Sequence, residues 1–128
     1  MIENNQSSSN KTNSSPKIHP LADVNSKAEL GQGVIVGAGS VIGSEVEIGS
    51  NTVIAPNVVI DGRVKIGSSN KIFPGACIGL EPQDLKYRGA PTEVIIGDNN
   101  TFRECITVNR ATNEGEQTRI GNCSLFMA

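Results

Sequence analysis

Residues 30–66 read LGQGVIVGAGSVIGSEVEIGSNTVIAPNVVIDGRVKI, and every sixth residue, from Leu30 to Ile66, is a large aliphatic one. The spacing extends on both sides of this stretch, so that every sixth position from Ile18 to Ile78 holds Ile, Leu or Val. The 3.6-residue period of an α-helix does not divide six, and the two-residue alternation of a flat strand does not single out one position in six. The period therefore predicts a repeat protein.

Two further positions of each hexad follow a rule. The residue after the large aliphatic one is often glycine, at positions Gly31, Gly37, Gly43, Gly49, Gly67 and Gly79. Four positions after the large aliphatic residue comes a small or β-branched residue, and Asn70 departs from this rule. This pattern fits a strand, a turn and another strand wound as a coil, in which glycine supplies unusual backbone angles at the corners. Three hexads make a triangular turn of about 18 residues, and successive turns stack about 4.8 Å apart.

The six-residue phase is interrupted twice. It returns at Ile96, Phe102, Val108, Ile120 and Phe126. Between these positions, Asp84, Ala90 and Glu114 break the pattern. We therefore predict two excursions from the coil, near residues 80–94 and 109–119. Both are polar and contain turn residues, and a solenoid pushes such insertions outward, where functional residues tend to lie.

The length of 128 residues allows a single domain. Residues 1–16 are almost entirely polar, and we predict that they form a disordered tail. Residues 17–128 are predicted to form the β-helix, incomplete at its C-terminus. Only 3% of the residues are aromatic, so the predicted core is thin and aliphatic.

Charge and cysteine content exclude several classes of protein. The net charge is −2 with both signs interspersed, so nucleic-acid binding is not predicted. No apolar run approaches the roughly 20 residues that span a bilayer, and the N-terminus lacks the features of a secretory signal. The three cysteines form no CxxC pair and there is one histidine, His19. We expect reduced thiols in a cytoplasmic protein, with no metal site and no cofactor.

The hexad of a large aliphatic residue, glycine and a small residue resembles the hexapeptide-repeat family. That family winds left-handed, against the right-handed rule for parallel strand crossovers. The resemblance implies an all-β protein, a left-handed parallel β-helix shaped as a triangular prism, with the two excursions as external loops.

The first excursion carries a more specific resemblance. Residues 78–92, IGLEPQDLKYRGAPT, are similar to a loop of the UDP-N-acetylglucosamine O-acyltransferases that open lipid A synthesis. The segments 96–100, 102–104 and 107–112, and the opening Ile18-His19-Pro20, also resemble these enzymes. The resemblance implies transfer of an (R)-3-hydroxyacyl group from acyl-carrier protein to the glucosamine 3-hydroxyl of UDP-N-acetylglucosamine. It also implies a homotrimer when the protein is complete, with active sites between neighbouring prisms.

Three residues of the first excursion are candidate substrate contacts by this resemblance. Asp84 is expected to hydrogen-bond the sugar nucleotide, Lys86 to face the bound substrate, and Gln83 to lie near the acyl chain. A carboxylate accepts hydrogen bonds from sugar hydroxyls, and an ammonium suits phosphate or acyl oxygens. The alternative is that they are solvated loop residues.

Arg103, Glu104 and Arg110 are interpreted differently from these candidates. We expect these three residues to form ion pairs between coils or subunits rather than to contact substrate.

A sugar hydroxyl is a poor nucleophile at neutral pH, so the reaction needs a general base. The resemblance implies a histidine in this role, in a coil that would follow Ala128, and a structural role for His19. A backbone N–H is expected to stabilise the oxyanion. No catalytic residue is therefore assigned, and the chain alone is predicted to be inactive. The sequence does not predict the acyl-chain length.

Three other functions were weighed. An acetyl-CoA-dependent hexapeptide enzyme would lack the Gln83–Tyr87 loop sequence, and a γ-class carbonic anhydrase would need three zinc-binding histidines. A non-catalytic hexapeptide scaffold and another hexapeptide acetyltransferase are the alternatives that remain open.

Overall fold

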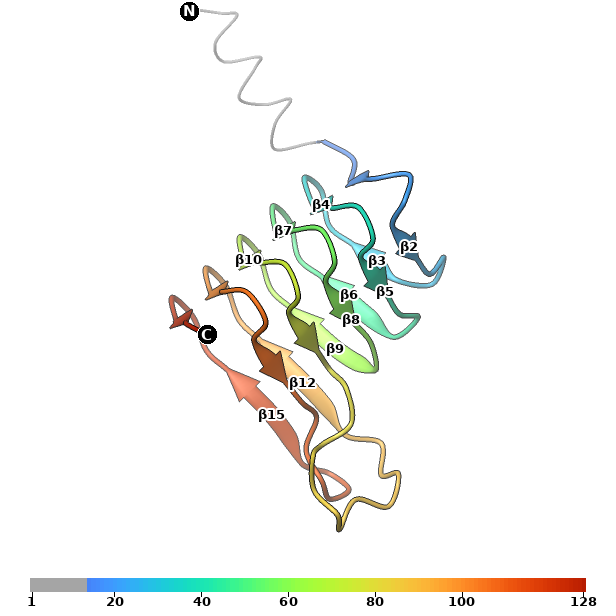
Figure 1. The fold of residues 1–128 in the computed structure, drawn as a ribbon, viewed down its shortest axis with the longest axis vertical. Helices are drawn as coiled ribbons and strands as arrows, with labels where there is room; N and C mark the ends of the chain where they lie inside the picture. The colour runs from blue at the N-terminus through green and yellow to red at the C-terminus, as the bar shows by residue number, and fades with distance from the viewer. Residues whose placement is uncertain (1–13) are drawn as a thin grey trace, which may run out of the picture.

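The computed structural model describes residues 14–128, and within that range it contains β-strands and no helix (Figure 1). The tail predicted for residues 1–16 lies mostly outside the described residues. From Lys17 onward the chain winds as stacked coils, and each coil contributes one short strand to each of three sheets.

Every third strand belongs to the same sheet, and all pairs are parallel. Sheet A contains β1 (Lys17–Ile18), β4 (Ile35–Val36), β7 (Val53–Ile54), β10 (Lys71–Ile72), β13 (Thr101–Phe102) and β16 (Leu125–Phe126). Sheet B contains β2 (Asp23–Val24), β5 (Val41–Ile42), β8 (Val59–Ile60), β11 (Cys77–Ile78) and β14 (Thr107–Val108). Sheet C contains β3 (Glu29–Leu30), β6 (Val46–Ile48), β9 (Arg63–Ile66), β12 (Glu93–Ile96) and β15 (Gln117–Ile120). This is the predicted three-sided parallel β-helix.

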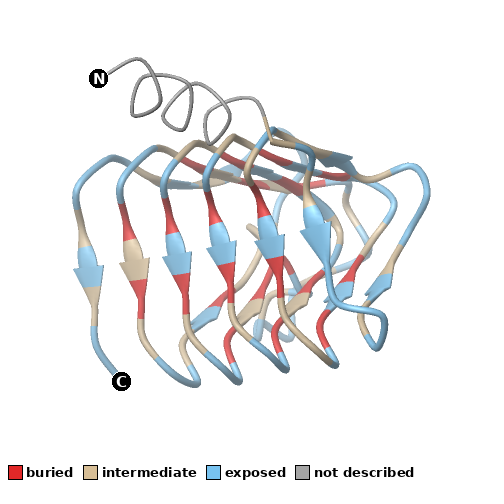
Figure 2. Ribbon diagram, turned by 90° about the horizontal axis from the view of Figure 1, so that it is seen from above, coloured by how far each residue is buried: buried red, intermediate tan, exposed pale blue. Residues whose placement is uncertain are grey.

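The large residue of each hexad points into the prism, as predicted. Buried and exposed residues alternate along the strands (Figure 2), and in β9 Val64 and Ile66 are buried while Arg63 and Lys65 are exposed. From Val36 to Phe102 the in-phase side chains are at most 4% exposed. Full burial of an Ile or Val side chain contributes about 2 kcal/mol of transfer free energy, so stability grows with each stacked coil.

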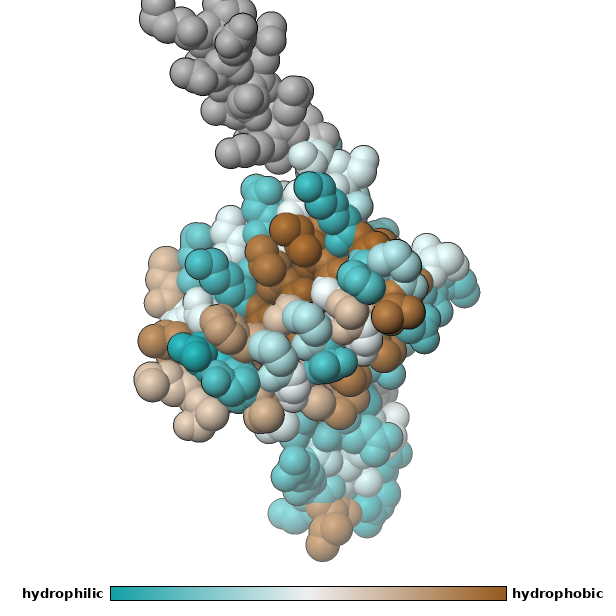
Figure 3. Space-filling model, turned by 45° about the horizontal axis from the view of Figure 1, so that its top comes forward, coloured by the Kyte–Doolittle hydropathy of each residue, from teal (hydrophilic) through white to brown (hydrophobic). Residues whose placement is uncertain are grey.

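The two ends of the prism are less covered than its middle. Ile18 in the first coil is 45% exposed, whereas Ile54 and Ile72 in the middle are 1% exposed. Apolar side chains gather near the start of the described chain (Figure 3). At the other end, Phe126 stacks on the buried Phe102 with ring centroids 5.1 Å apart, but is itself partly exposed.

The prediction that the in-phase glycines supply unusual backbone angles was wrong for most of them. Of the six, only Gly79 has a positive φ, of 91°. Four of the other five are required by space, since a Cβ there would meet the backbone of the next coil: a Cβ on Gly31 would lie 2.6 Å from the Ser50 nitrogen. At Gly43 the close atom belongs to the Asp61 side chain. Positive φ occurs two residues later, at the corners after sheets A and C, as at Gly39 and Asn51.

Asn70 departs from the small-residue pattern because it bonds to the coils on either side of it. Its side chain is fully buried, and its backbone N–H donates to the Thr52 hydroxyl at 3.3 Å. Its amide nitrogen donates to the Gly97 carbonyl at 2.9 Å, and its side-chain oxygen accepts from the Asn100 N–H at 2.8 Å. A buried polar side chain is tolerated when its groups are satisfied in this way.

Insertions do not disturb the stacking. In neighbouring regular coils, aligned residues such as Ser40 and Val58 are 18 positions apart in sequence. The separation is 30 positions between Asn70 and Asn100, and 24 between Asn100 and Ser124. The additional residues form two loops. The first loop is residues 79–92, between β11 and β12, and the second loop is residues 109–116, between β14 and β15. Both are shorter than the predicted excursions, because residues 93–94 and 117–119 lie in strands of sheet C.

Candidate functional site

Both loops emerge from the same corner of the prism. β11 and β14 are neighbours in sheet B, and β12 and β15 are neighbours in sheet C. Each loop therefore leaves sheet B and enters sheet C directly beside the other, and together they project from the prism (Figure 1). The only other positive-φ residue at this corner in the described part, apart from those in the two loops, is Gly62.

Arg110 fixes the start of the first loop. Its side-chain Nε donates to the Gly79 carbonyl at 2.8 Å, and its backbone N–H donates to the Leu80 carbonyl at 2.9 Å. Gly79 is buried, and a Cβ there would collide with the Val64 side chain. These contacts fix the backbone at the point where the chain leaves β11.

Tyr87 holds the first loop folded on itself. Its hydroxyl donates to the Ala90 carbonyl at 3.1 Å, and its N–H donates to the Asp84 carbonyl at 3.0 Å. Arg110 donates from Nη1 to the Tyr87 hydroxyl at 3.3 Å, and its guanidinium carbon lies 5.8 Å from the ring centroid. The second loop thus supports the middle of the first loop as well as its start.

Asp84 is exposed, but both of its carboxylate oxygens have partners. Oδ1 accepts the Lys86 N–H at 2.9 Å within the same loop. Oδ2 accepts the Thr112 hydroxyl at 3.0 Å from the second loop. A carboxylate offers about four acceptor positions, so two are open toward a ligand.

The three predicted site residues lie within four positions of one another in the first loop. Gln83, Asp84 and Lys86 are all exposed, and Leu85 between them is 98% exposed. Within residues 14–128 the Lys86 ammonium and the Gln83 amide have no hydrogen-bond or ion-pair partner. The projecting loop is mostly hydrophilic with an apolar tip (Figure 3). The loop therefore presents donors, an acceptor and an apolar side chain together.

A cavity of about 490 Å³ opens at the base of the first loop. It is lined by Asp61, Gly62, Gly79, Leu80, Glu81 and Arg110. Two carboxylates and one guanidinium therefore line a recess next to the candidate residues. The sequence alone indicated neither this recess nor the contacts of Tyr87 and Thr112, because they depend on how two irregular loops meet.

Within the described residues Arg103 and Arg110 form no ion pair with another coil, so that part of the prediction was wrong, and ion pairs between subunits stay a prediction. Arg103 pairs with its sequence neighbour Glu104, with 3.0 Å between Nε and Oε1, and its guanidinium lies 4.4 Å from the Phe73 ring centroid. A hydrogen bond from its own backbone and one from Arg103 hold the pKa of the Glu104 carboxyl below its ordinary value. Arg110 bonds to a carbonyl and a phenol instead of a carboxylate.

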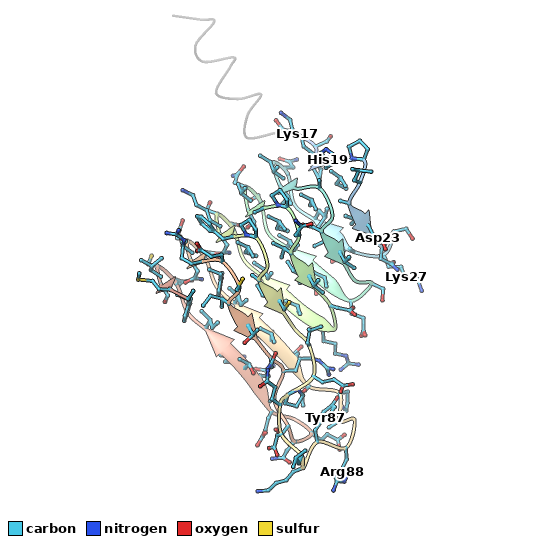
Figure 4. All side chains as sticks on the ribbon, viewed as in Figure 1. Lys17, His19, Asp23, Lys27, Tyr87 and Arg88 are labelled. Atoms are coloured by element: carbon cyan, nitrogen blue, oxygen red, sulfur yellow. The ribbon has the colours of Figure 1, made fainter. Side chains whose placement is uncertain are left out.

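His19 lies at the opposite end of the prism from the loops, as the labelled His19 and Tyr87 show (Figure 4). Its Nδ1 accepts the Leu21 N–H at 3.0 Å, which fixes the turn that opens the first coil. In the part of the chain that is described, no three His, Cys, Asp or Glu side chains come together as metal ligands. The same part holds no helix of sufficient length and apolarity to cross a bilayer.

Comparison with known proteins agrees with this geometry. Residues 27–62 match the family model described as bacterial transferase hexapeptide (six repeats). The acyl-[acyl-carrier-protein]–UDP-N-acetylglucosamine O-acyltransferase of Akkermansia muciniphila is 58% identical over 112 residues, which are 88% of this chain and 43% of that protein. The enzyme of the same name from Halorhodospira halophila is 56% identical over 113 residues, 88% of this chain and 44% of that protein.

Solved structures resemble the chain over most of its length. The UDP-N-acetylglucosamine O-acyltransferase from Moraxella catarrhalis superposes with a TM-score of 0.83 and 41% identity, over 86% of this chain and 43% of that one. The UDP-N-acetylglucosamine acyltransferase from Bacteroides fragilis superposes with a TM-score of 0.82 and 43% identity, over 85% of this chain and 43% of that one. The fold is the predicted left-handed parallel β-helix. The chain spans less than half the length of these relatives.

Proposed function

Because this chain belongs to the hexapeptide-repeat family of acyl-[acyl-carrier-protein]–UDP-N-acetylglucosamine O-acyltransferases, we propose that its first loop forms part of a site for UDP-N-acetylglucosamine. The proposal is supported by the exposure of Gln83, Asp84 and Lys86 on a loop that the second loop holds in place. A site held by a rigid scaffold binds with less loss of entropy than a free loop would.

The proposed reaction is the first step of lipid A synthesis. The 3-hydroxyl of the glucosamine attacks the thioester carbonyl of an (R)-3-hydroxyacyl group on acyl-carrier protein. A carbon–oxygen bond forms, the carbon–sulfur bond breaks, and the hydroxyl proton passes through a general base to the departing thiol. The product is the 3-O-acylated sugar nucleotide.

Each candidate residue has a role that follows from its chemistry. The open acceptor positions of Asp84 receive hydrogen bonds from sugar hydroxyls, and this orients the ring. The free ammonium of Lys86 attracts a phosphate or the acyl oxygen, and Gln83 lies toward the acyl chain. We propose that the base is a histidine outside this chain, because His19 lies at the far end of the prism from these residues (Figure 4).

The binding test uses the whole chain and UDP-N-acetylglucosamine, with the dissociation constant measured by calorimetry. We expect the Asp84→Asn variant to bind about 10-fold more weakly, which corresponds to about 1.4 kcal/mol for a charge-assisted hydrogen bond. Glu114→Gln is the matched control, since it removes the same charge from the exposed tip of the second loop. Equal affinities of Asp84→Asn and wild type would remove Asp84 from the site.

The activity test uses a chimera in which residues 18–128 replace the matching part of the Akkermansia muciniphila relative. We expect the chimera to transfer an acyl group from acyl-carrier protein to UDP-N-acetylglucosamine, and the 128-residue chain alone to transfer none. A homotrimer is proposed for the chimera, measurable by light scattering. If the chain failed to bind the nucleotide and the chimera were inactive, a non-catalytic scaffold would be the better description.

A further inference from the structure

We infer that Thr112 is a positioning residue, which fixes the orientation of the Asp84 carboxylate for the nucleotide sugar. This inference rests on the proposed function, but it concerns a residue of the second loop that would act through Asp84. The Thr112 hydroxyl donates to Asp84 Oδ2 at 3.0 Å. It is the only side chain of residues 14–128 that hydrogen-bonds the Asp84 carboxylate.

A carboxylate on an exposed loop needs such a partner to keep one orientation. Rotation about the last side-chain torsion of aspartate is broad and poorly restricted. The Lys86 N–H holds Oδ1 from one side at 2.9 Å. With Oδ2 held by Thr112 as well, the plane of the carboxylate is fixed, and its open acceptor positions point in constant directions.

Thr112 can do this because its own backbone segment is anchored. Arg110 bonds to Gly79 and Leu80 at the start of the first loop. Ala111 accepts through its carbonyl the hydroxyl of Thr92, at the end of that loop, at 2.6 Å, and Thr92 is 1% exposed. Residues 110–112 therefore span the mouth of the first loop, from its start to its end. The hydroxyl of Thr112 then bonds to Asp84 within the first loop.

Both loops emerge at the same corner, and this brings Thr112 of the second loop to Asp84 of the first. The second loop is closed on itself by Asn113 and Glu116, with the Glu116 N–H donating to the Asn113 carbonyl at 3.0 Å. Thr112 thus stands between an anchored segment and a closed turn.

Five variants of the 128-residue chain test the inference by calorimetric titration with UDP-N-acetylglucosamine. Thr112→Val keeps the shape and removes the donor, and we expect the dissociation constant to rise about 3- to 10-fold. Thr112→Ser keeps the hydroxyl and should bind within about 2-fold of wild type. Thr118→Val is the matched control, because Thr118 in β15 donates to the Asn109 carbonyl of the second loop at 2.8 Å and has no hydrogen bond to Asp84.

The double variant Asp84→Ala/Thr112→Val separates positioning from general stability. The single variant Asp84→Ala is the fifth variant and the reference: if Thr112 acts through Asp84, the double variant binds no more weakly than Asp84→Ala alone, because the two effects share one interaction. Additive losses, or a loss in Thr118→Val equal to that in Thr112→Val, would overturn the inference while leaving the proposed site intact.

Amide hydrogen exchange at Lys86 gives a second measurement that needs no ligand. Freeing Oδ2 lets the carboxylate turn away from the Lys86 N–H, so exchange there should accelerate several-fold in Thr112→Val and not in Thr112→Ser. If wild type bound no nucleotide, the proposed function would fail. Unchanged exchange in Thr112→Val would show separately that Thr112 does not order Asp84.

Discussion

The backbone amide of Asn100 donates a hydrogen bond of 2.8 Å to the side-chain oxygen of Asn70, although the two residues are 30 positions apart in sequence. Asn100 repeats the arrangement toward the next coil, where its side-chain oxygen accepts the Ser124 N–H at 2.9 Å. Thr52 provides the preceding step with its hydroxyl, which the Asn70 N–H reaches at 3.3 Å. A ladder of polar side chains thus runs along one inner corner and links coils of different lengths.

Asn70→Ala should destabilise the fold substantially. The substitution leaves the buried Asn100 N–H and the Gly97 carbonyl without partners, at a cost of about 2–4 kcal/mol in the free energy of unfolding. Urea denaturation followed by circular dichroism measures the change. Asn25→Ala is the control, because Asn25 accepts the Lys27 N–H at 2.9 Å on the surface, and it should cost about 0.5 kcal/mol or less. Similar losses in both variants would contradict the role of the ladder.

Gly49→Ala and Gly121→Ala test whether the in-phase glycines are required by space. A Cβ on Gly49 would lie 2.6 Å from the Gly67 carbonyl carbon, whereas a Cβ on Gly121 has nothing within 4 Å. Neither residue has a positive φ. We expect Gly49→Ala to cost about 1–3 kcal/mol through overpacking and Gly121→Ala to stay within about 0.5 kcal/mol of wild type. The midpoint of thermal unfolding would report both, and equal losses would mean that backbone conformation decides instead.

The sequence predicted those parts of the molecule that repeat. The inward direction of Ile54 or Ile72 follows from the six-residue period, because every coil places that position in the same environment. Asn70 could not be predicted, since two partners of its side chain, the Gly97 carbonyl and the Asn100 N–H, lie beyond the first loop. The pattern also does not indicate whether a glycine is needed for its φ or for its missing Cβ. For most of the in-phase glycines here, the missing Cβ is the reason.

The candidate site was predictable only in part. Asp84, Lys86 and Gln83 came from a resemblance in the first loop, and all three are exposed in the structure. The role of Arg110 was missed because an arginine near acidic residues suggests an ion pair, whereas here it bonds to the Gly79 carbonyl and the Tyr87 hydroxyl. Contacts between two non-repeating loops leave no periodic signal in the sequence.

Glu104→Gln should reduce the pH dependence of stability. The backbone hydrogen bond and Arg103 lower the pKa of Glu104 in the folded chain, so the folded state favours the ionised form. The stabilisation is present above the ordinary pKa of 4.5 and is lost as the pH falls through the lowered pKa. Wild type should therefore exceed the variant in unfolding midpoint at pH 7 and match it at a pH below the lowered pKa. The same difference at both pH values would contradict this assignment.

Glu29→Lys should stabilise the prism through the outer face of sheet C. Glu29 lies directly opposite Glu47 in the pairing of β3 with β6, and Glu47 also faces Lys65, with 3.9 Å between carboxylate oxygen and Nζ. Like charges opposite each other on neighbouring strands are unfavourable by about 0.2–1 kcal/mol. Replacing Glu29 by lysine removes that repulsion and places an ammonium opposite Glu47. At low salt we expect a gain of about 0.3–1 kcal/mol in the free energy of unfolding.

Salt and a matched variant decide whether the gain is electrostatic. The Debye length falls from about 10 Å at 0.1 M salt to about 3 Å at 1 M, so the gain should shrink at the higher concentration. Asp23→Lys makes the same change of charge at the equivalent strand position of sheet B, where Val41 lies opposite. It should give no comparable gain. A gain in Glu29→Lys that persists at 1 M salt, or that Asp23→Lys reproduces, would mean that strand propensity or net charge is responsible instead of the Glu29–Glu47 pair.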